Sequence, residues 1–384
     1  MKQSATFAAD IGSDTVKVIV GQTAPDGNLS ISGMGTCPTA GFAKGVITDN
    51  RRLAETIRQA VDCAAEAAGT SGPIYLGISG IFVDFQRCRG SVAPASRQGI
   101  TAEDIENCHG AAVLMGVRPE QRALHTIPLG YRLDGRPESA LPLGQQASRL
   151  EVDMCVVTAD SYVVENLLGA LHGVGIQPAG IFANVITGST YLAGDTSCLI
   201  IDMGDGTTEL SNCDGGLKSA AILPLGGIYI TQDIAQALSV NMEQAKSIKR
   251  YYAGLDGSLR GRNVTLDLGE CGVSGVQVEY DFLHTVIESR VEEIVDLIHA
   301  EIRSGGFGAV RTVIFTGGCV RLPSVARRLE AVLSADVIIA SLDKVSPEYN
   351  SPVNTAAYGI LRHAASQQPV RPASGFWQKL KRYI

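Results

Sequence analysis

The chain has 384 residues, of which 45% are hydrophobic and 18% charged, and its formal net charge is -7. This length exceeds the roughly 250–300 residues at which single cores stop growing, so we expect at least two domains. The net negative charge argues against nucleic acid as the main partner, because phosphate backbones are bound through basic surfaces. No apolar run approaches the roughly 20 residues of a membrane-spanning helix, so any membrane contact is expected to be peripheral.

The sequence contains nine cysteines, and no two of them have the Cys-x-x-Cys spacing typical of zinc ribbons and thioredoxin-type motifs. The start, Met1-Lys2-Gln3-Ser4, has no apolar segment behind its positive charge, so we expect no secretion. The cysteines are therefore expected to be reduced thiols of a cytoplasmic protein.

The N-terminal segment predicts a three-stranded meander. Two runs, Ala5–Ile11 and Thr15–Val20, flank a break at Gly12-Ser13. A third run, Leu29–Met34, follows another turn signal. Short strands separated by polar turns that contain glycine are typical of antiparallel meanders.

An α/β pattern follows the meander. The apolar stripe of Arg51–Ala68 predicts a helix that ends at Gly69, and Ile74–Ser79 is typical of a buried strand.

The pattern changes between Ile81 and about Asp160. Strand-like stretches at Phe82–Arg87 and Met154–Thr158 enclose a helix predicted over Ala102–Met115, with Thr101 as its cap. We interpret this segment as an inserted α/β subdomain.

The meander pattern then returns, with strands predicted over Ser197–Asp202, Thr207–Cys213 and Leu217–Leu223. In each copy an aspartate closes the first strand, and a glycine follows it two residues later. The matching pairs are Asp10 with Gly12 and Asp202 with Gly204. Such a repeat indicates two halves built on one plan.

The remainder of the second half is mainly helical. Glu243–Tyr252 and Leu283–Arg303 have strong helical patterns, and the glycine-rich Gly254–Gly275 between them predicts loops of a second inserted subdomain. The strand Thr312–Thr316 leads into Gly317-Gly318 and a helix that extends to Ser334.

The two Asp-Gly turns predict a polyphosphate site. Backbone N–H groups in a tight glycine turn can point at one phosphate group, and two facing turns would hold a polyphosphate from both sides. Asp10 and Asp202 would then face a hard cation such as Mg²⁺, and Lys17 would bring a positive charge to the phosphates. One such turn alone is more often an ordinary hairpin, so the repetition carries this prediction.

These motifs resemble the two phosphate loops and the adenosine loop of the actin, Hsp70 and sugar-kinase superfamily. The three segments are Asp10–Ser13 with Lys17, Asp202–Thr208 and Thr316–Gly318, in the order and at the spacing of that superfamily. Within it the chain is most similar to the bacterial cell-division FtsA family over essentially its whole length. Further stretches that carry this resemblance are Lys44-Gly45-Val46-Ile47, His125-Thr126-Ile127-Pro128, Pro142-Leu143-Gly144, Arg149-Leu150-Glu151-Val152, Pro224-Leu225-Gly226-Gly227 and Arg290-Val291-Glu292-Glu293-Ile294.

The resemblance implies an α/β, actin-like (ribonuclease-H-like) duplicated fold, with two halves around a nucleotide cleft and an inserted α/β subdomain in the first half. That insertion is expected in a position unlike that of the corresponding part of actin. The implied divisions are 1–80, 161–186 and 343–366 for subdomain 1A, 81–160 for 1C, 187–227 and 304–342 for 2A, 228–303 for 2B, 367–374 for a linker and 375–384 for a terminal helix.

The family also implies ATP and Mg²⁺ as cofactors, and Asp10 and Asp202 as residues that hold the metal through water. It implies polymerisation into filaments that tether the tail of the tubulin-like protein FtsZ to the cytoplasmic face of the inner membrane at the division septum, together with other division proteins. The implied nucleotide-binding residues are Gly12, Ser13, Asp14, Lys17, Gly204, Asp205, Gly206, Thr207, Thr208, Gly226, Gly227, Glu243, Lys246, Lys249, Gly317 and Gly318.

Three positions depart from the usual family pattern, and three others carry little weight alone. Asp205 stands where relatives usually have glycine, and Cys319 replaces a customary small residue. Asn184 lies where relatives often place an acidic or amide side chain, and an amide is a poor general base, so ATPase activity is expected to be weak or absent. Glu243, Lys246 and Lys249 also fit an ordinary exposed helix face.

The last ten residues predict an amphipathic helix behind a proline-bearing linker, Gln367–Ser374. Its apolar face consists of Phe376, Trp377, Leu380, Tyr383 and Ile384, and its basic flank of Lys379, Lys381 and Arg382. Aromatic residues favour the headgroup boundary and basic residues attract anionic lipid, so we expect this helix to bind a membrane surface. A terminal helix docked on the protein body is the alternative.

Two other functions remain open at this level. One is the related adaptor of type IV pilus assembly, which shares the inserted subdomain but normally lacks the linker and terminal helix. The other, less favoured, is a small-molecule kinase, which would need a catalytic carboxylate beside an acceptor pocket.

Overall fold

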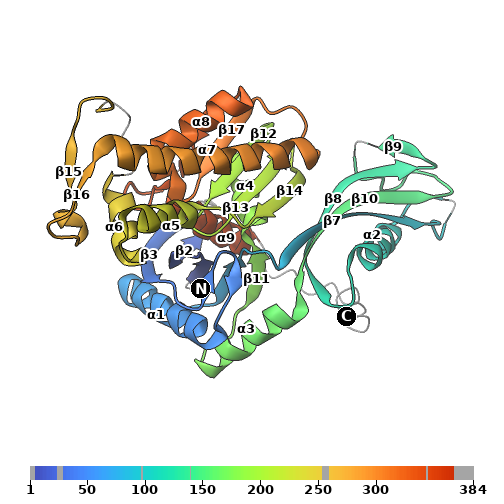
Figure 1. The fold of residues 1–384 in the computed structure, drawn as a ribbon. Coiled ribbons are helices and arrows are strands. Elements are labelled where there is room, and N and C mark those ends of the chain that lie inside the picture. Colours follow the sequence, from blue (N-terminus) through green and yellow to red (C-terminus); the bar gives the residue numbers. More distant parts are fainter. Residues whose placement is uncertain are drawn as a thin grey trace.

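Two five-stranded sheets of one design form the two halves of the chain in this computed structural model (Figure 1). The structure describes residues 5–23, 29–96, 98–138, 140–252, 259–342 and 345–366. The predicted linker 367–374 and terminal helix 375–384 lie outside the described residues.

The sheet of the first half combines an antiparallel meander with two parallel strands. Its spatial order is β11 (Gly180–Ala183), β6 (Ile74–Ile78), β1 (Thr6–Ile11), β2 (Thr15–Thr23) and β3 (Leu29–Pro38). Strands β1, β2 and β3 pair antiparallel, whereas β6 runs parallel to both β1 and β11.

The sheet of the second half repeats this topology strand for strand. Its order is β14 (Leu217–Leu223), β13 (Thr208–Cys213), β12 (Cys198–Met203), β17 (Thr312–Thr316) and β18 (Asp336–Ile339). Again the three meander strands pair antiparallel and the other two are parallel to the first. The duplication predicted from the Asp-x-Gly repeat is thereby confirmed, and so is the actin-like fold class.

Helices cover both sheets. In the first half these are α1 (Asn50–Ala68), α3 (Ser161–Gly173) and α9 (Thr355–Ser366). In the second half they are α4 (Asn184–Ala193), α5 (Gly227–Leu238), α6 (Met242–Tyr252), α7 (Tyr280–Ser304) and α8 (Pro323–Leu333). Helix α4 follows β11 of the first sheet, packs on α9 and contacts β12, β13 and β14. Helix α1 begins where the Asp49 side chain accepts a hydrogen bond from Arg52 N, and it ends at Gly69 in the left-handed conformation. The buried stripe of α7 runs from Leu283 to Ile302, as its sequence pattern predicts.

Short elements complete the two halves. They are the hairpin strands β4 (Phe42–Ala43) and β5 (Val46–Ile47), the hairpin strands β15 (Thr265–Asp267) and β16 (Gln277–Glu279), and the 3₁₀ turns η1 (Gly269–Cys271), η2 (Gly318–Arg321) and η3 (Pro352–Asn354). The segment predicted as loops between α6 and α7 thus includes a strand, β15, that pairs with β16. After Gly317 the predicted single helix is a 3₁₀ turn followed by α8, because the chain breaks at Leu322 before Pro323 begins the helix.

The predicted inserted subdomain is an antiparallel sheet with one helix. Its strand order is β7 (Val83–Val92), β10 (Leu150–Asp160), β8 (Gln121–Leu133) and β9 (Arg136–Glu138), and the helix is α2 (Ala102–Gly116). It has its own apolar core and lies to one side of the two central sheets (Figure 1). Thr101 and Asp104 form a reciprocal capping box at the start of α2, as the sequence predicts.

His125 of β8 joins this subdomain to the first half. Its Nε2 accepts a hydrogen bond of 2.9 Å from Ala183 N, directly before α4. Burial, with the nearby His363, lowers the pKa of His125 to about 3. The ring therefore stays neutral at physiological pH, as an acceptor from a backbone N–H must be.

Among the residues that the structure describes, no helix is both long and apolar enough to cross a bilayer. All nine cysteines fall within the described ranges and are free thiols.

Candidate nucleotide-binding cleft

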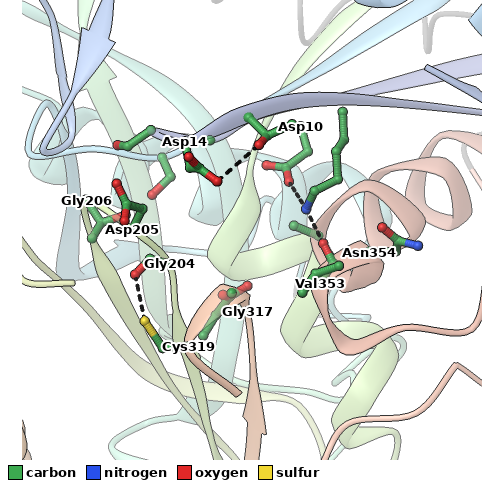
Figure 2. A pocket seen from close by; sticks show the side chains of 18 of the residues that line it. Asp10, Asp14, Gly204, Asp205, Gly206, Gly317, Cys319, Val353 and Asn354 are labelled. Carbon is green, nitrogen blue, oxygen red and sulfur yellow. Dashed lines mark hydrogen bonds and ion pairs between the residues drawn. The ribbon is translucent and has the colours of Figure 1, made fainter. Parts of the chain in front are cut away.

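A cleft of about 660 Å³ lies between the two halves, at the turns that follow β1 and β12. The first half lines it with the β1–β2 turn and Lys17, and the second half with the β12–β13 turn. The loop that begins at Gly317 closes it on a third side. Figure 2 shows Asp10 and Asp14 on one side and Gly204, Asp205 and Gly206 facing them. The structure therefore brings together the three glycine loops that the sequence analysis selected.

The two turns approach each other so closely that glycine is needed where they meet. A Cβ atom added to Gly206 would lie 2.7 Å from Ser13 Cβ and 2.9 Å from Lys44 Cα. A Cβ on the neighbouring Gly45 would lie 2.7 Å from Thr207 Cγ2. Because real Cβ contacts are longer than this, side chains here would force the two halves apart.

Gly317 has a comparable role in the third loop. Its φ of 91° favours glycine, and an added Cβ would lie 2.6 Å from Met203 O and collide with Asp202 Oδ1. At the adjacent Gly318 an added Cβ would meet no atom within 4 Å. Cys319 completes the contact, since its thiol donates a hydrogen bond of 3.3 Å to Gly204 O (Figure 2). The third loop is thus packed directly on the second phosphate loop.

Three carboxylates line the cleft: the buried Asp10 and Glu209 and the partly buried Asp202. Burial raises the pKa of Asp10, and Lys17 and Asn184 oppose that rise. The Lys17 ammonium lies 3.7 Å from Asp10 Oδ2 and also donates to Val353 O, while Asn184 Nδ2 donates a hydrogen bond of 2.8 Å to Asp10 Oδ1. Asn184 therefore lines the cleft and orients this carboxylate.

The negative charges of the two acidic residues of the second half, Asp202 and Glu209, are less well compensated by nearby cations. Burial and then the charge of Asp10 raise the pKa of Asp202 to about 7, with Lys17 in opposition. Burial and the charge of Asp202 raise the pKa of Glu209 well above its usual range. Such shifts are typical of groups that work on a bound cation or a proton.

The sequence analysis missed Glu209. It reads as an ordinary residue of the second strand of the meander, but that strand pairs Glu209 directly with Asp202. Adjacent cross-strand residues lie on the same face of a sheet, so the register of β12 and β13 was the available signal.

A second cluster spans the mouth of the cleft. Asp14 of the first half forms ion pairs with Lys246 and Arg250, both from α6 of the second half; Arg250 Nη2 lies 2.8 Å from Asp14 Oδ2. Burial alone would raise the pKa of Asp14, but Lys246 and then Arg250 hold it below the usual value. Arg250 is a further cleft residue that the sequence analysis missed. The three side chains link the two halves beside the site.

Lys249 also reaches the second phosphate loop from α6. Its ammonium lies 3.0 Å from Asp205 Oδ1 and donates a hydrogen bond of 2.8 Å to Gly227 O. The carboxylate of Asp205, unusual for the family, therefore has a cationic partner within its own half. The ion pair between Lys249 and Asp205 fixes α6 to the second phosphate loop.

Most of the predicted nucleotide-binding residues line the cleft. They are Gly12, Ser13, Asp14, Lys17, Gly204, Asp205, Gly206, Thr207, Lys246, Lys249, Gly317 and Gly318, together with Asp10 and Asp202. Thr208, Gly226, Gly227 and Glu243 do not line it. Thr208 is buried and donates to Leu225 O, and Gly227 N donates to Gly204 O, so these residues support the loop from behind. Direct nucleotide contact stays a prediction for the residues that line the cleft and for these four.

The charges that line the cleft suit Mg²⁺ together with a polyphosphate. The carboxylates outnumber the one lysine that opposes them, and a divalent cation would relieve their repulsion. Among the described residues, no group of three or more His, Cys, Asp or Glu side chains could hold a metal by itself. A metal here would need further oxygen ligands, which phosphates and water provide.

Two family models match the chain. "SHS2 domain inserted in FTSA" matches residues 80–158, and "Cell division protein FtsA" matches residues 199–359. The chain is 31% identical to cell division protein FtsA of Bacillus subtilis over 363 residues, which are 88% of this chain and 80% of that protein. It is 27% identical to FtsA of Pseudomonas aeruginosa, over 94% of this chain and 89% of that protein.

The chain belongs to the FtsA family. The family model at 80–158 also confirms the inserted subdomain of the first half. An actin-like cell-division protein is therefore favoured over the pilus adaptor and the small-molecule kinase.

Solved structures support the fold. The PilM–PilN type IV pilus biogenesis complex aligns with a TM-score of 0.68 at 18% identity, over 94% of this chain and 99% of the other. MreB 5 of Spiroplasma citri bound to AMPPNP aligns with a TM-score of 0.51 at 12% identity, over the whole of both chains. At these identities the likeness concerns the actin-like fold alone.

Proposed function

We propose that this FtsA-family protein binds ATP with Mg²⁺ in the cleft, polymerises into filaments, and tethers FtsZ to the cytoplasmic face of the inner membrane at the division septum. The observation that supports the proposal best is the convergence of three glycine loops from two duplicated halves on one cleft. Each loop leaves backbone groups and small side chains toward the cleft, the arrangement that holds phosphate groups.

The side chains in the cleft would divide the work of binding. Lys17 would turn from Val353 O and Asp10 toward the phosphates, and Asp10 and Asp202 would hold the hydrated metal. Bound Mg²⁺ would supply the positive charge that both the carboxylates and a triphosphate require. Because each half contributes one phosphate loop, nucleotide binding would fix the two halves relative to each other, in a shape suited to assembly.

Glu209 changes what is expected of hydrolysis. The prediction of a weak ATPase rested on Asn184, whose amide orients Asp10 and cannot take up a proton. Glu209 is a titratable carboxylate inside the cleft, and a bound cation that favours its ionised form would let it accept a proton. We assign it that role in any hydrolysis of bound ATP.

Membrane binding is assigned to residues 375–384, which lie outside the described residues. So short a helix binds weakly alone, and a filament that presents many copies gains avidity of roughly 10²–10⁴. Membrane residence is thus coupled to assembly. The tail of FtsZ is assigned to the second inserted subdomain, residues 228–303, on the family resemblance.

Co-sedimentation with anionic vesicles tests the proposal. Full-length protein should pellet with phosphatidylglycerol-rich vesicles far more with ATP and Mg²⁺ than without them, and a variant ending at Ala373 should stay in the supernatant under both conditions. Electron microscopy of the pelleted vesicles should show ordered filaments. Equal pelleting of both proteins would rule out the tail as the membrane anchor, and absence of filaments would contradict polymerisation.

A further inference from the structure

Two cysteines of the first half lie together behind the phosphate loop. Cys37 is on β3 and is partly buried, and Cys63 is on α1 and is exposed. Of the other seven thiols, six are buried and Cys88 is partly buried. The pair is therefore the one place among the described residues where an exposed thiol has a thiol neighbour.

Glycines on β3 bring α1 close to this strand. A Cβ added to Gly35 would lie 2.5 Å from Ala64 N and 3.0 Å from Cys63 Cβ, and one added to Gly33 would lie 2.7 Å from Ala68 N. Residues two apart on a strand face the same side, so Cys37 shares the face that contacts the helix. The helix cannot approach the strand more closely, and its position is fixed by this packing.

The two thiols lie on the facing sides of this interface. Cys63 is next to Gly35 of β3, and Cys37 follows Gly35 by two residues on the same face of the strand. Burial, and then the Cys63 thiol, raise the pKa of Cys37. Cys63, the exposed member, is therefore the one that meets a dissolved reagent first.

We propose that Cys37 and Cys63 form a modification site that reacts with a low-molecular-weight disulfide and closes into an intramolecular disulfide. The Cys63 thiolate attacks one sulfur of the small disulfide and releases one small thiol, which leaves a mixed disulfide on Cys63. The Cys37 thiolate then attacks Cys63 Sγ and releases the second small thiol. Two protein thiols are oxidised, and one small disulfide is reduced to two thiols.

The position of Cys37 would transmit this modification to the cleft. On β3 the preceding residue, Thr36, lines the cleft, and Cys37 pairs with Val16 of β2. Two residues later, Thr39 donates from Oγ1 to Gly12 O at 2.7 Å and from its backbone N to Asp14 O at 3.1 Å. A covalent tie to α1 at Cys37 would therefore restrain the strand that holds the first phosphate loop.

A second close pair in the same chain provides an internal control. Cys198 and Cys213 stand directly opposite each other on β12 and β13, and both are buried. Burial raises the pKa of Cys213 to about 12, with Cys198 adding to the rise. Buried thiols of this kind are inert, so proximity without access should yield no product in the folded protein.

The test is a native incubation of the full-length protein with oxidised glutathione, followed by alkylation, digestion and mass spectrometry. We expect a Cys37–Cys63 cross-linked peptide, at least about tenfold more abundant than any Cys198–Cys213 product. Cys63→Ser should abolish the cross-link, and Cys88→Ser should leave it unchanged. Dithiothreitol should reverse it.

Three outcomes would overturn the proposal: free Cys37 and Cys63 after the incubation, a stable glutathione adduct on Cys63 without cross-linking, or equal yield from the buried pair. Circular dichroism of Cys63→Ser, an exposed position, checks that the variant folds. The chemistry does not depend on nucleotide binding, so a protein that cross-links but binds no nucleotide would contradict the proposed function alone.

Discussion

The two phosphate loops have the same backbone plan and opposite charges at the equivalent position. In the first half Asp10 pairs across the strands with Lys17, and in the second half Asp202 pairs with Glu209. The lysine opposes the rise in the pKa of Asp10, whereas burial and two neighbouring carboxylates raise the pKa of the second-half acids. The two copies thus share a backbone and differ in charge at one position, with a lysine in the first half and a glutamate in the second. Under the proposed function, the lysine would serve the phosphates and the glutamate the metal and the proton.

The largest expected effect comes from making the two loops alike. Lys17→Glu would place a fourth carboxylate beside the three that line the cleft and remove the cation, so we expect nucleotide affinity to fall by at least about 100-fold. Isothermal calorimetry with ATP and Mg²⁺ measures this. Lys218→Glu, the same charge change on β14 outside the cleft lining, should bind as the wild type does. Wild-type affinity in Lys17→Glu would show that the charge difference between the two loops does not govern nucleotide binding.

Glu209→Gln tests the repulsion among the carboxylates of the second half. The pKa values of Asp202 and Glu209 are raised in the folded protein. With no ligand bound, the folded protein therefore binds more protons than the unfolded chain at pH values between the unfolded and the folded pKa. These two groups consequently make the protein less stable as the pH rises through that range toward pH 7 and above. The variant should therefore be more stable than the wild type at pH 8 by about 1–2 kcal/mol, with the difference shrinking toward pH 5. Urea unfolding without metal at both pH values measures it.

The same variant should slow single-turnover hydrolysis of bound ATP by about 10²-fold, because an amide cannot act as a general base. A variant that is less stable than the wild type at pH 8 would contradict the assigned repulsion. A hydrolysis rate that does not change would remove Glu209 from the proton transfer.

The smallest effect is expected from the ion pairs that join the two sides. Asp14→Asn and Lys246→Gln should each speed nucleotide release by about three- to tenfold, because partly exposed pairs contribute modestly. The double variant should be no faster than the faster single variant if the two residues act through each other. Stopped-flow displacement of a fluorescent nucleotide measures release, and Asp62→Asn, in an exposed pair on α1, is the control. Additive effects would show that the residues act separately.

Local patterns predicted much of this fold and part of its site. The strand–turn–strand repeats, the helix stripes of α1 and α7 and the cap at Thr101 all depend on residues near in sequence, and the structure confirms them. The phosphate loops could be selected because their glycines repeat.

Contacts between residues far apart in the sequence could not be predicted from local patterns. Arg250 reaches Asp14 across 236 positions, and no local pattern marks either residue as a partner. Strand β8 was not predicted, and it contains Pro128 and Gly130, two residue types that are uncommon inside strands. The structure accommodates Pro128 beside a bulge, where β10 shifts register between Asp153 and Met154. Glu209 required the strand register, which only the folded sheet fixes.

If the three glycine loops close on one nucleotide, two adjacent glycine variants should differ in nucleotide affinity, and calorimetry measures that difference. A Cβ at Gly317 would strike the second phosphate loop, whereas a Cβ at Gly318 meets open space. With ATP and Mg²⁺, we predict binding heat for the wild type and for Gly318→Ala, and a loss of affinity of at least about tenfold for Gly317→Ala. No binding heat for the wild type, or equal affinity of the two variants, would contradict the closure of the three loops on one nucleotide.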